Sequence, residues 1–150
     1  MKKVAALSLL ALAIITGCKS ANNGGDNAGN TAAVGEQSFK ILYQGGYGGR
    51  DTESYEVITT QQQLTSLEKE LNIQEAKTVN FSESNVVALF MGQKRTGGYS
   101  IDVEKVSEAG GVLTVTKKVT VPEPGAMVTM ALTSPYCVAV IPKADRVVVE

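Results

Sequence analysis

The C-terminal half of the chain has a hydrophobic period of two, and this pattern constrains the fold more than any other feature. Val86–Met91 is an unbroken apolar run, which is typical of a strand buried on both faces. Two later segments alternate apolar and polar residues on either side of Gly110-Gly111, which predicts a hairpin that turns at the glycines. The segments that predict strands are 85–92, 99–106, 112–121, 136–141 and 146–149.

The alternation also predicts which side chains face the core. Within 112–121, the odd-numbered residues share the apolar side and the even-numbered residues share the solvent side. Val119 and Val121 therefore belong to the apolar side. Residues 38–44 and 55–59, nearer the start of the domain, alternate in the same way and predict two further strands.

One helix is predicted between the early and late strands. Residues 60–71 carry three leucines at spacings of three and four, as one face of an α-helix requires: Leu64, Leu67 and Leu71. Thr59 or Thr60 is suited to cap the start of the helix, and Asn72 is suited to end it. We therefore predict a strand-dominated α+β fold with one helix, built on a mainly antiparallel sheet or a small sandwich.

The N-terminus has the features of an export leader. Lys2 and Lys3 precede Val4–Ile15, an apolar run that only Ser8 interrupts. About a dozen residues is too short to span a bilayer, which takes about 20. The run has the length of the hydrophobic region of a secretory signal peptide. We expect residues 1–17 to be removed.

The apolar run ends in Ile15-Thr16-Gly17-Cys18, which resembles the bacterial lipobox. This resemblance implies that Cys18 becomes the first residue and receives lipid, so that membrane lipid is one partner of the chain. Each buried methylene contributes about 0.8 kcal/mol to membrane binding, so several acyl chains hold a protein firmly. Lys19 and Ser20 follow the cysteine, and no Asp stands directly after it, which favours the outer membrane of a bacterial cell envelope.

A flexible tether is predicted after the cysteine. Residues 19–36 are rich in Gly, Asn, Ala and Ser and nearly free of large apolar side chains. Such a segment cannot bury enough surface to offset its ordering entropy. We therefore divide the chain into a signal peptide (1–17), a lipidated cysteine with a linker (18–36) and a single globular domain (37–150).

The residue types present argue against catalysis. The chain has no histidine, which removes the commonest general base and the Ser-His and Cys-His nucleophile pairs. Two cysteines, one of them predicted to carry lipid, cannot build a structural zinc site. Five candidate carboxylates lie on predicted polar faces or in turns: Glu53, Glu56, Asp102, Glu104 and Glu123. We predict a protein that is not an enzyme and uses no metal or cofactor.

Charge and aromatic content argue against a nucleic-acid partner. The chain has 14 Lys and Arg against 15 Asp and Glu, a net charge of −1, whereas phosphate binders present a basic stripe. It has no Trp, three Phe and five Tyr, which leaves few side chains for base stacking. The glycines of 45–49 lack the Gly-Lys-Ser/Thr ending of a phosphate loop and predict only a flexible connection.

Cys137 is the second cysteine and has no partner once Cys18 carries lipid. Its neighbours, Pro135-Tyr136 before it and Val138-Ala139-Val140 after it, have the pattern of a strand. We predict that Cys137 is a buried structural residue rather than a reactive thiol.

Two connecting segments are the candidate binding region. Residues 92–101 contain Gly97-Gly98, which permit a tight turn. Residues 124–136 form a long loop with apolar side chains, which is unusual unless the loop packs down or binds something. Two interpretations stay open: the loops close one end of the fold, or they bind a partner. The candidate partner-binding residues are Lys94, Thr96, Gly97, Gly98, Tyr99, Met127, Met130 and Leu132.

The same two segments resemble the C-terminal domain of the PrcB family, lipoproteins associated with a surface protease complex. The resemblance rests on GQKRTGGYSIDVEKV and PGAMVTMALTSPYCVAVIPK and covers about 85–143. Arg95 stands where we expect the family to have Pro. The resemblance implies a non-catalytic accessory subunit that stabilises or assembles an exported protease.

A shorter motif suggests a different role. Thr96-Gly97-Gly98-Tyr99 is similar to the Thr-Thr-Gly-Tyr loop that chagasin-type inhibitors insert into the cleft of a cysteine protease. This similarity implies a small β-sandwich that inhibits a protease. A third hypothesis is a structural module of the cell envelope with no protease partner.

Overall fold

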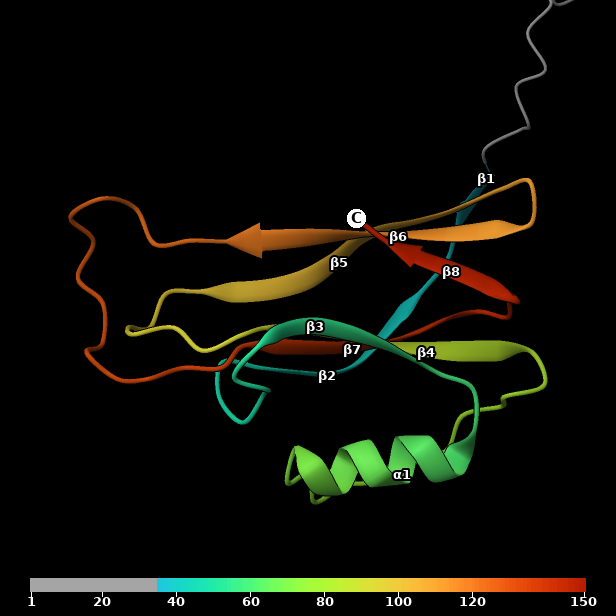
Figure 1. Ribbon diagram of the computed structural model, residues 1–150, viewed down its shortest axis with the longest axis horizontal. Coiled ribbons are helices and arrows are strands. Elements are labelled where there is room, and N and C mark those ends of the chain that lie inside the picture. Colours follow the sequence, from blue (N-terminus) through green and yellow to red (C-terminus); the bar gives the residue numbers. More distant parts are fainter. Residues whose placement is uncertain (1–34) are drawn as a thin grey trace, which may run out of the picture. The chain divides into compact units, whose positions relative to one another are not determined.

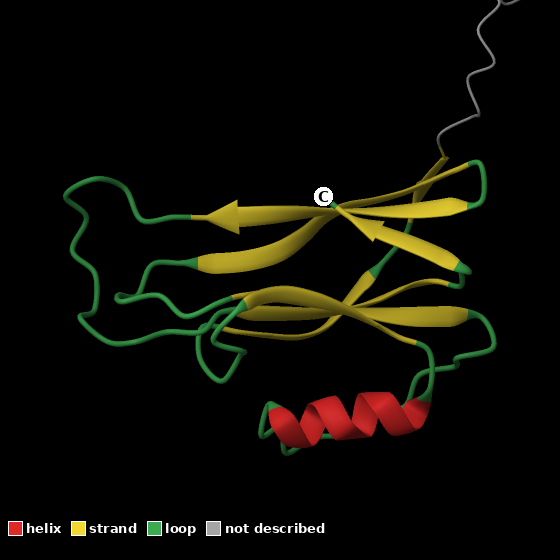
Figure 2. Ribbon diagram, viewed as in Figure 1, coloured by secondary structure: helices red, strands yellow, loops and turns green. Residues whose placement is uncertain are grey.

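The structure is a computed structural model that describes residues 35–150. The predicted signal peptide, Cys18 and residues 19–34 of the predicted linker lie outside the described residues. In the described part, one helix, α1 (Gln61–Glu70), accompanies two sheets of four strands each (Figure 1). The predicted strand-dominated α+β class is confirmed (Figure 2). No helix within 35–150 is long and apolar enough to cross a membrane.

The strands fall close to the predicted segments. Three longer connections between strands are 46–52, 92–99 and 121–135. The eight strands are β1 (Gly35–Gln37), β2 (Lys40–Gly45), β3 (Glu53–Ile58), β4 (Ser84–Met91), β5 (Ser100–Ala109), β6 (Val112–Thr120), β7 (Tyr136–Pro142) and β8 (Arg146–Val149).

The two sheets stack face to face, with α1 on the outer side of one of them (Figure 1). The first sheet has the order β1-β5-β6-β8 and the second has the order β2-β7-β4-β3. All neighbours are antiparallel except β6 and β8, which are parallel. Because β4 and β7 belong to one sheet and β5 and β6 to the other, the connections 92–99 and 121–135 both cross between the sheets.

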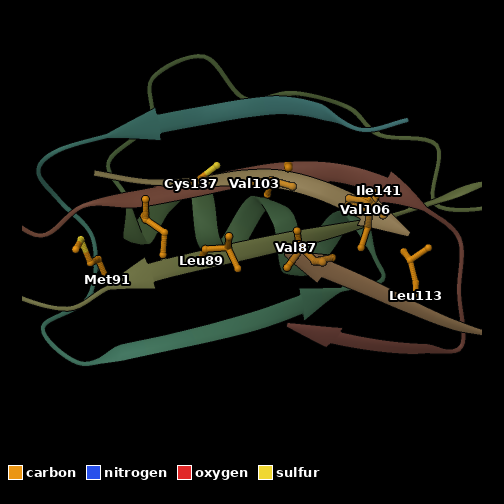
Figure 3. Packing of buried hydrophobic residues seen from close by; sticks show 11 residues of the cluster. Val87, Leu89, Met91, Val103, Val106, Leu113, Cys137 and Ile141 are labelled. Atoms are coloured by element: carbon orange, nitrogen blue, oxygen red, sulfur yellow. The ribbon is translucent and has the colours of Figure 1, made fainter. Parts of the chain in front are cut away.

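Strand β4 is buried on both faces, as its unbroken apolar sequence predicts. Alternate residues, such as Leu89, point into the cluster between the sheets, which Cys137 of β7 also joins (Figure 3). The intervening residues, such as Phe90, point to a second cluster under α1. A central strand between two apolar layers has no solvent side, which is why its sequence does not alternate.

Helix α1 begins and ends as predicted. Thr60 is the N-cap, and its hydroxyl accepts a hydrogen bond from the Gln63 N–H at 3.3 Å. The Gln63 side chain also accepts a hydrogen bond from the N–H of Thr59, the residue before the cap, at 3.0 Å, which fastens the chain entering the helix. After the last turn, Asn72 adopts a φ of 54°, the left-handed conformation that ends helices. Leu64 and Leu67 of α1 and its C-cap residue Leu71 are all buried in the cluster between the helix and the sheet.

Glu68 is a charged residue on the buried side of α1, with only 2 % of its surface exposed. Its Oε1 accepts hydrogen bonds from the Tyr43 hydroxyl at 2.6 Å and from the Lys77 N–H at 2.9 Å. Burial and the hydrogen bond to Glu68 raise the pKa of Tyr43. The carboxylate therefore joins α1 to strand β2 and to the segment after the helix.

Two strand predictions are corrected. The first strand was predicted at 38–44, but Gly35–Gln37 already form β1 and pair with β5. Val119 and Val121 were predicted on the apolar side of the segment 112–121, yet both are exposed, and Val121 lies just after the end of β6. Strand β8 pairs with β6 only as far as Val115, so the part of β6 that carries Val119 has only β5 beside it in this sheet.

An ion pair holds the connection 46–52 against α1. Arg50 donates from Nε to Glu70 at 2.7 Å and from Nη2 to Glu56 at 2.8 Å. Its guanidinium also lies 4.4 Å from the centre of the Phe90 ring. The hydrogen bond from Arg50 lowers the pKa of Glu70.

This shift predicts a loss of stability in acid that depends on Glu70. A carboxyl whose pKa is lower in the folded state stabilises the fold above its unfolded pKa, and the contribution disappears as pH falls through the folded pKa. The thermal midpoint of Glu70→Gln should therefore fall less between pH 7 and acid than that of the wild type. The difference is small because both side chains are partly exposed. Glu108→Gln, at an exposed site, should follow the wild type, and identical curves for all three proteins would contradict the prediction.

Candidate partner-binding loops

Three connections meet at the same end of the stacked sheets (Figure 1). They are 46–52 between β2 and β3, 92–99 between β4 and β5, and 121–135 between β6 and β7. Backbone hydrogen bonds join all three connections. We call the three connections together the loop layer. The sequence predicted the last two as a binding region and the first only as a flexible connection.

The connections 92–99 and 121–135 pair like two short strands. The Lys94 N–H donates to the Thr133 carbonyl at 2.8 Å, and the Thr133 N–H donates back to Lys94 at 2.9 Å. Farther along, the Gly97 N–H donates to Thr129 at 2.8 Å. The buried Thr133 hydroxyl adds a bond to the Thr96 carbonyl at 2.9 Å. These bonds give the long connection a defined position without a regular strand.

The glycine-rich connection 46–52 completes the layer. The Gly49 N–H donates to the Ser134 carbonyl at 2.9 Å, and the Ser134 N–H donates to Gly46 at 3.0 Å. The approach at Gly49 is close: a Cβ there would lie 2.5 Å from the Ser134 oxygen. Only glycine fits between the two backbones at that point, so the glycine serves contact between loops rather than flexibility alone.

The exposed apolar surface of the loop layer comes chiefly from 121–135. Met127 is 102 % exposed, Met130 is 85 % exposed and Leu132 is 61 % exposed. We call these three residues the apolar tip. Large apolar side chains held in water on an ordered loop are typical of a binding surface, and methionine adapts its shape to a partner.

The predicted residues of 92–99 have a different environment from the apolar tip. Thr96 and Gly97 are half-buried and bonded to the neighbouring loop, whereas Gly98 is exposed with a φ of 86°. Tyr99 packs against the cluster between the sheets, and the Lys94 ammonium lies 5.9 Å from the centre of its ring. This connection therefore supports the loop layer, while the apolar tip supplies most of its exposed apolar area.

Tyr47 is an exposed residue of the loop layer that sequence reasoning missed. It lies in 46–52 and is 61 % exposed. The signal was present, because an aromatic residue between two glycine pairs has no neighbours with which to form a buried face. The contact of this segment with 121–135 depends on the fold and left no trace in the local sequence.

Cys137 is buried in the cluster between the sheets, as predicted. Its Sγ lies 3.7 Å from Oδ1 of Asp102. Burial, together with the charge of Asp102, raises the pKa of the Cys137 thiol to about 12. The thiol therefore stays protonated near neutral pH, which is the state of an inert structural cysteine.

A cleft in the described part lies away from the apolar tip. It has a volume of about 530 Å³ and is lined by residues of β3 from one sheet and of β6 and β8 from the other, and Lys117 pairs with Glu53 there at 3.5 Å. None of the predicted partner-binding residues lines this cleft. Within 35–150, no group of three or more acidic or cysteine side chains is placed to hold a metal ion.

Comparison with known families bears on the same segment. Residues 85–142 match the family model described as PrcB C-terminal. The comparisons with curated proteins and with solved structures found no match. The matched residues run from β4 to the end of β7, so they include both 92–99 and 121–135. The family model therefore matches the segment in which the two motifs predicted a resemblance to the PrcB family.

Proposed function

We propose that this protein is a lipid-anchored, non-catalytic accessory subunit that binds an exported protease through the apolar tip. The observation that carries the proposal is the exposure of Met127, Met130 and Leu132 on an ordered loop within the PrcB C-terminal match. The PrcB family suggests association with a protease complex. No cofactor enters this function, because it requires binding and no bond cleavage.

The physical case rests on burial of the tip by a partner. Covering a Leu or Met side chain is worth about 1.5–3 kcal/mol, so three such residues can form the energetic centre of an interface. The backbone bonds at Lys94, Gly97 and Gly49 already order the loop. A partner therefore meets a surface that needs little further ordering on binding.

The geometry favours the apolar tip over the inhibitor-like turn as the docking element. Thr96 and Gly97 are engaged through their backbones with 121–135, so inserting 96–99 alone into a protease cleft would break those bonds. Gly98 has a φ of 86°, and a Cβ there would lie 3.0 Å from Pro122. Substitutions in this turn would therefore disturb folding and binding together, which makes the apolar tip the better place for a test.

A crosslinking experiment tests the proposed function. The full-length protein is crosslinked in its native membrane, purified and analysed for bound proteins. We expect one exported protease to be recovered, and Met127→Ser/Met130→Ser/Leu132→Ser to lose it without a change in thermal midpoint. A matched control, Tyr55→Ser/Val148→Ser, removes exposed apolar side chains outside the loop layer and should keep the protease. Recovery of only abundant envelope proteins, equal for all variants, would instead support the structural-module hypothesis.

Anchoring through Cys18 places the protein in the bacterial cell envelope, at the outer membrane. Cys18→Ala should move the protein from the membrane fraction to the soluble fraction, because the acyl chains are lost. Fractionation with labelled palmitate measures both properties at once. Cys137→Ala is the matched control, since that thiol is buried, and it should stay membrane-bound and labelled. Membrane retention of Cys18→Ala would contradict the anchor.

A further inference from the structure

The methionines of the described part fall into two classes. Met127 and Met130 are 102 % and 85 % exposed, whereas Met91 in β4 is 5 % exposed and belongs to the cluster between the sheets. Figure 3 shows Met91 among the side chains of that cluster. A solvent-borne reagent can therefore reach the two methionines of the loop layer, while Met91 is shielded by the fold.

We propose that Met127 and Met130 are sites of reversible oxidation by peroxides, and that forming their sulfoxides releases the partner from the apolar tip. This regulation rests on the proposed function, because it acts on the same surface. Met127 and Met130 are the most exposed residues of the apolar tip, and they are also the two most exposed methionines within residues 35–150.

The chemistry at each site is a two-electron oxygen transfer. A lone pair of the methionine sulfur attacks one oxygen of hydrogen peroxide, so that an S–O bond forms while the O–O bond breaks. The departing hydroxide takes the proton of the transferred oxygen and becomes water. The sulfur is oxidised by two electrons to the sulfoxide and the peroxide is reduced by two. Methionine sulfoxide reductases reverse this product, so the change is suited to regulation.

The consequence for binding follows from the polarity of the product. A sulfoxide is polar, and burying a polar group without a hydrogen-bond partner is unfavourable, whereas burying the thioether is favourable. The fold itself should tolerate oxidation at Met127, because a fully exposed side chain has no packing to lose. Oxidation of Met91 would have the opposite effect, since its side chain fills the interior.

Peroxide treatment of the full-length protein tests accessibility first. Peptide masses are followed over time, and we expect Met127 and Met130 to oxidise at least about tenfold faster than Met91, in line with their exposure. The bound partner should slow oxidation at both sites by covering them. Equal rates at Met91 and Met130 in the folded protein would overturn the proposal.

Two variants then test the regulation. Met127→Leu/Met130→Leu keeps the apolar character and cannot be oxidised, so its partner recovery should resist peroxide. Met127→Gln/Met130→Gln imitates the polar product and should lose the partner even without peroxide, with the thermal midpoint unchanged.

The outcomes separate this proposal from the proposed function. If the protein still recovers its partner in full when Met127 and Met130 are completely oxidised, the oxidation switch is overturned and docking is left intact. If Met127→Ser/Met130→Ser/Leu132→Ser recovers as much partner as the wild type, docking through the apolar tip is overturned, and the oxidation switch with it.

Discussion

Replacing Phe90 with alanine is expected to lower the free energy of unfolding by about 3–5 kcal/mol, the range for large-to-small changes of buried aromatic residues. Phe90 is fully buried near the C-terminal end of β4 and belongs to the cluster between the second sheet and α1. The substitution leaves a cavity that the flanking β3 and β7 cannot close without leaving register. It also removes the ring that lies under the Arg50 guanidinium.

Denaturant unfolding of the purified protein measures this effect. Tyr47→Ala is the matched control, because it removes an exposed aromatic ring from a loop and should change stability by at most about 0.5 kcal/mol. A loss below about 1 kcal/mol for Phe90→Ala would contradict the packing described for β4 and α1.

Replacing Gly49 with alanine is expected to displace the loop layer and to abolish partner recovery. The new Cβ would lie 2.5 Å from the Ser134 carbonyl oxygen, which is backbone and cannot rotate away. The bond from the Gly49 N–H to Ser134 must then break, and 121–135 must shift. Overpacking of this kind costs about 1–3 kcal/mol, and here it also moves the segment that carries Met130 and Leu132.

Gly46→Ala provides a close control for this substitution. It lies in the same glycine-rich connection, but a Cβ at Gly46 meets nothing within 4 Å. Gly46→Ala should therefore keep both the stability and the partner recovery of the wild type. Equal behaviour of Gly46→Ala and Gly49→Ala in unfolding and crosslinking would contradict the contact between the loops.

The parts of the fold that the sequence predicted are those with local signals. The period of two located the later strands, and the unbroken run at Val86–Met91 indicated burial on both faces, because hydrophobic patterning follows the geometry of a single strand. Both ends of α1 were predictable from local residues as well, since Thr60 caps the start of the helix and Asn72 follows its end with a positive φ.

Other features depend on residues far apart in the chain. The parallel pairing of β6 with β8 depends on where the last strand returns to the sheet, and this pairing stops at Val115, before the exposed Val119. The burial of Glu68 requires Tyr43, which lies 25 positions earlier. A helical pattern alone assigns a glutamate beside Leu67 to water, because its compensating hydrogen bonds are not visible in the local sequence.

The candidate site was predictable in location but not in construction. A long loop with Met127, Met130 and Leu132 stood out because apolar side chains are unusual there. That 92–99 supports this loop through Lys94 became apparent only from its pairing with Thr133. The contribution of Gly49 depends on the pairing of β2 with β7, which brings the connection 46–52 beside the end of 121–135.

Site-specific photocrosslinking tests the central claim, docking through the apolar tip, most directly. A photoreactive amino acid is placed at Met130 in one full-length protein and at Val148, exposed on β8, in another. After irradiation in the native membrane, we predict a single crosslinked protein at position 130, identified by mass as an exported protease, and none at 148. The same set of envelope proteins captured equally from both positions would contradict docking through this loop.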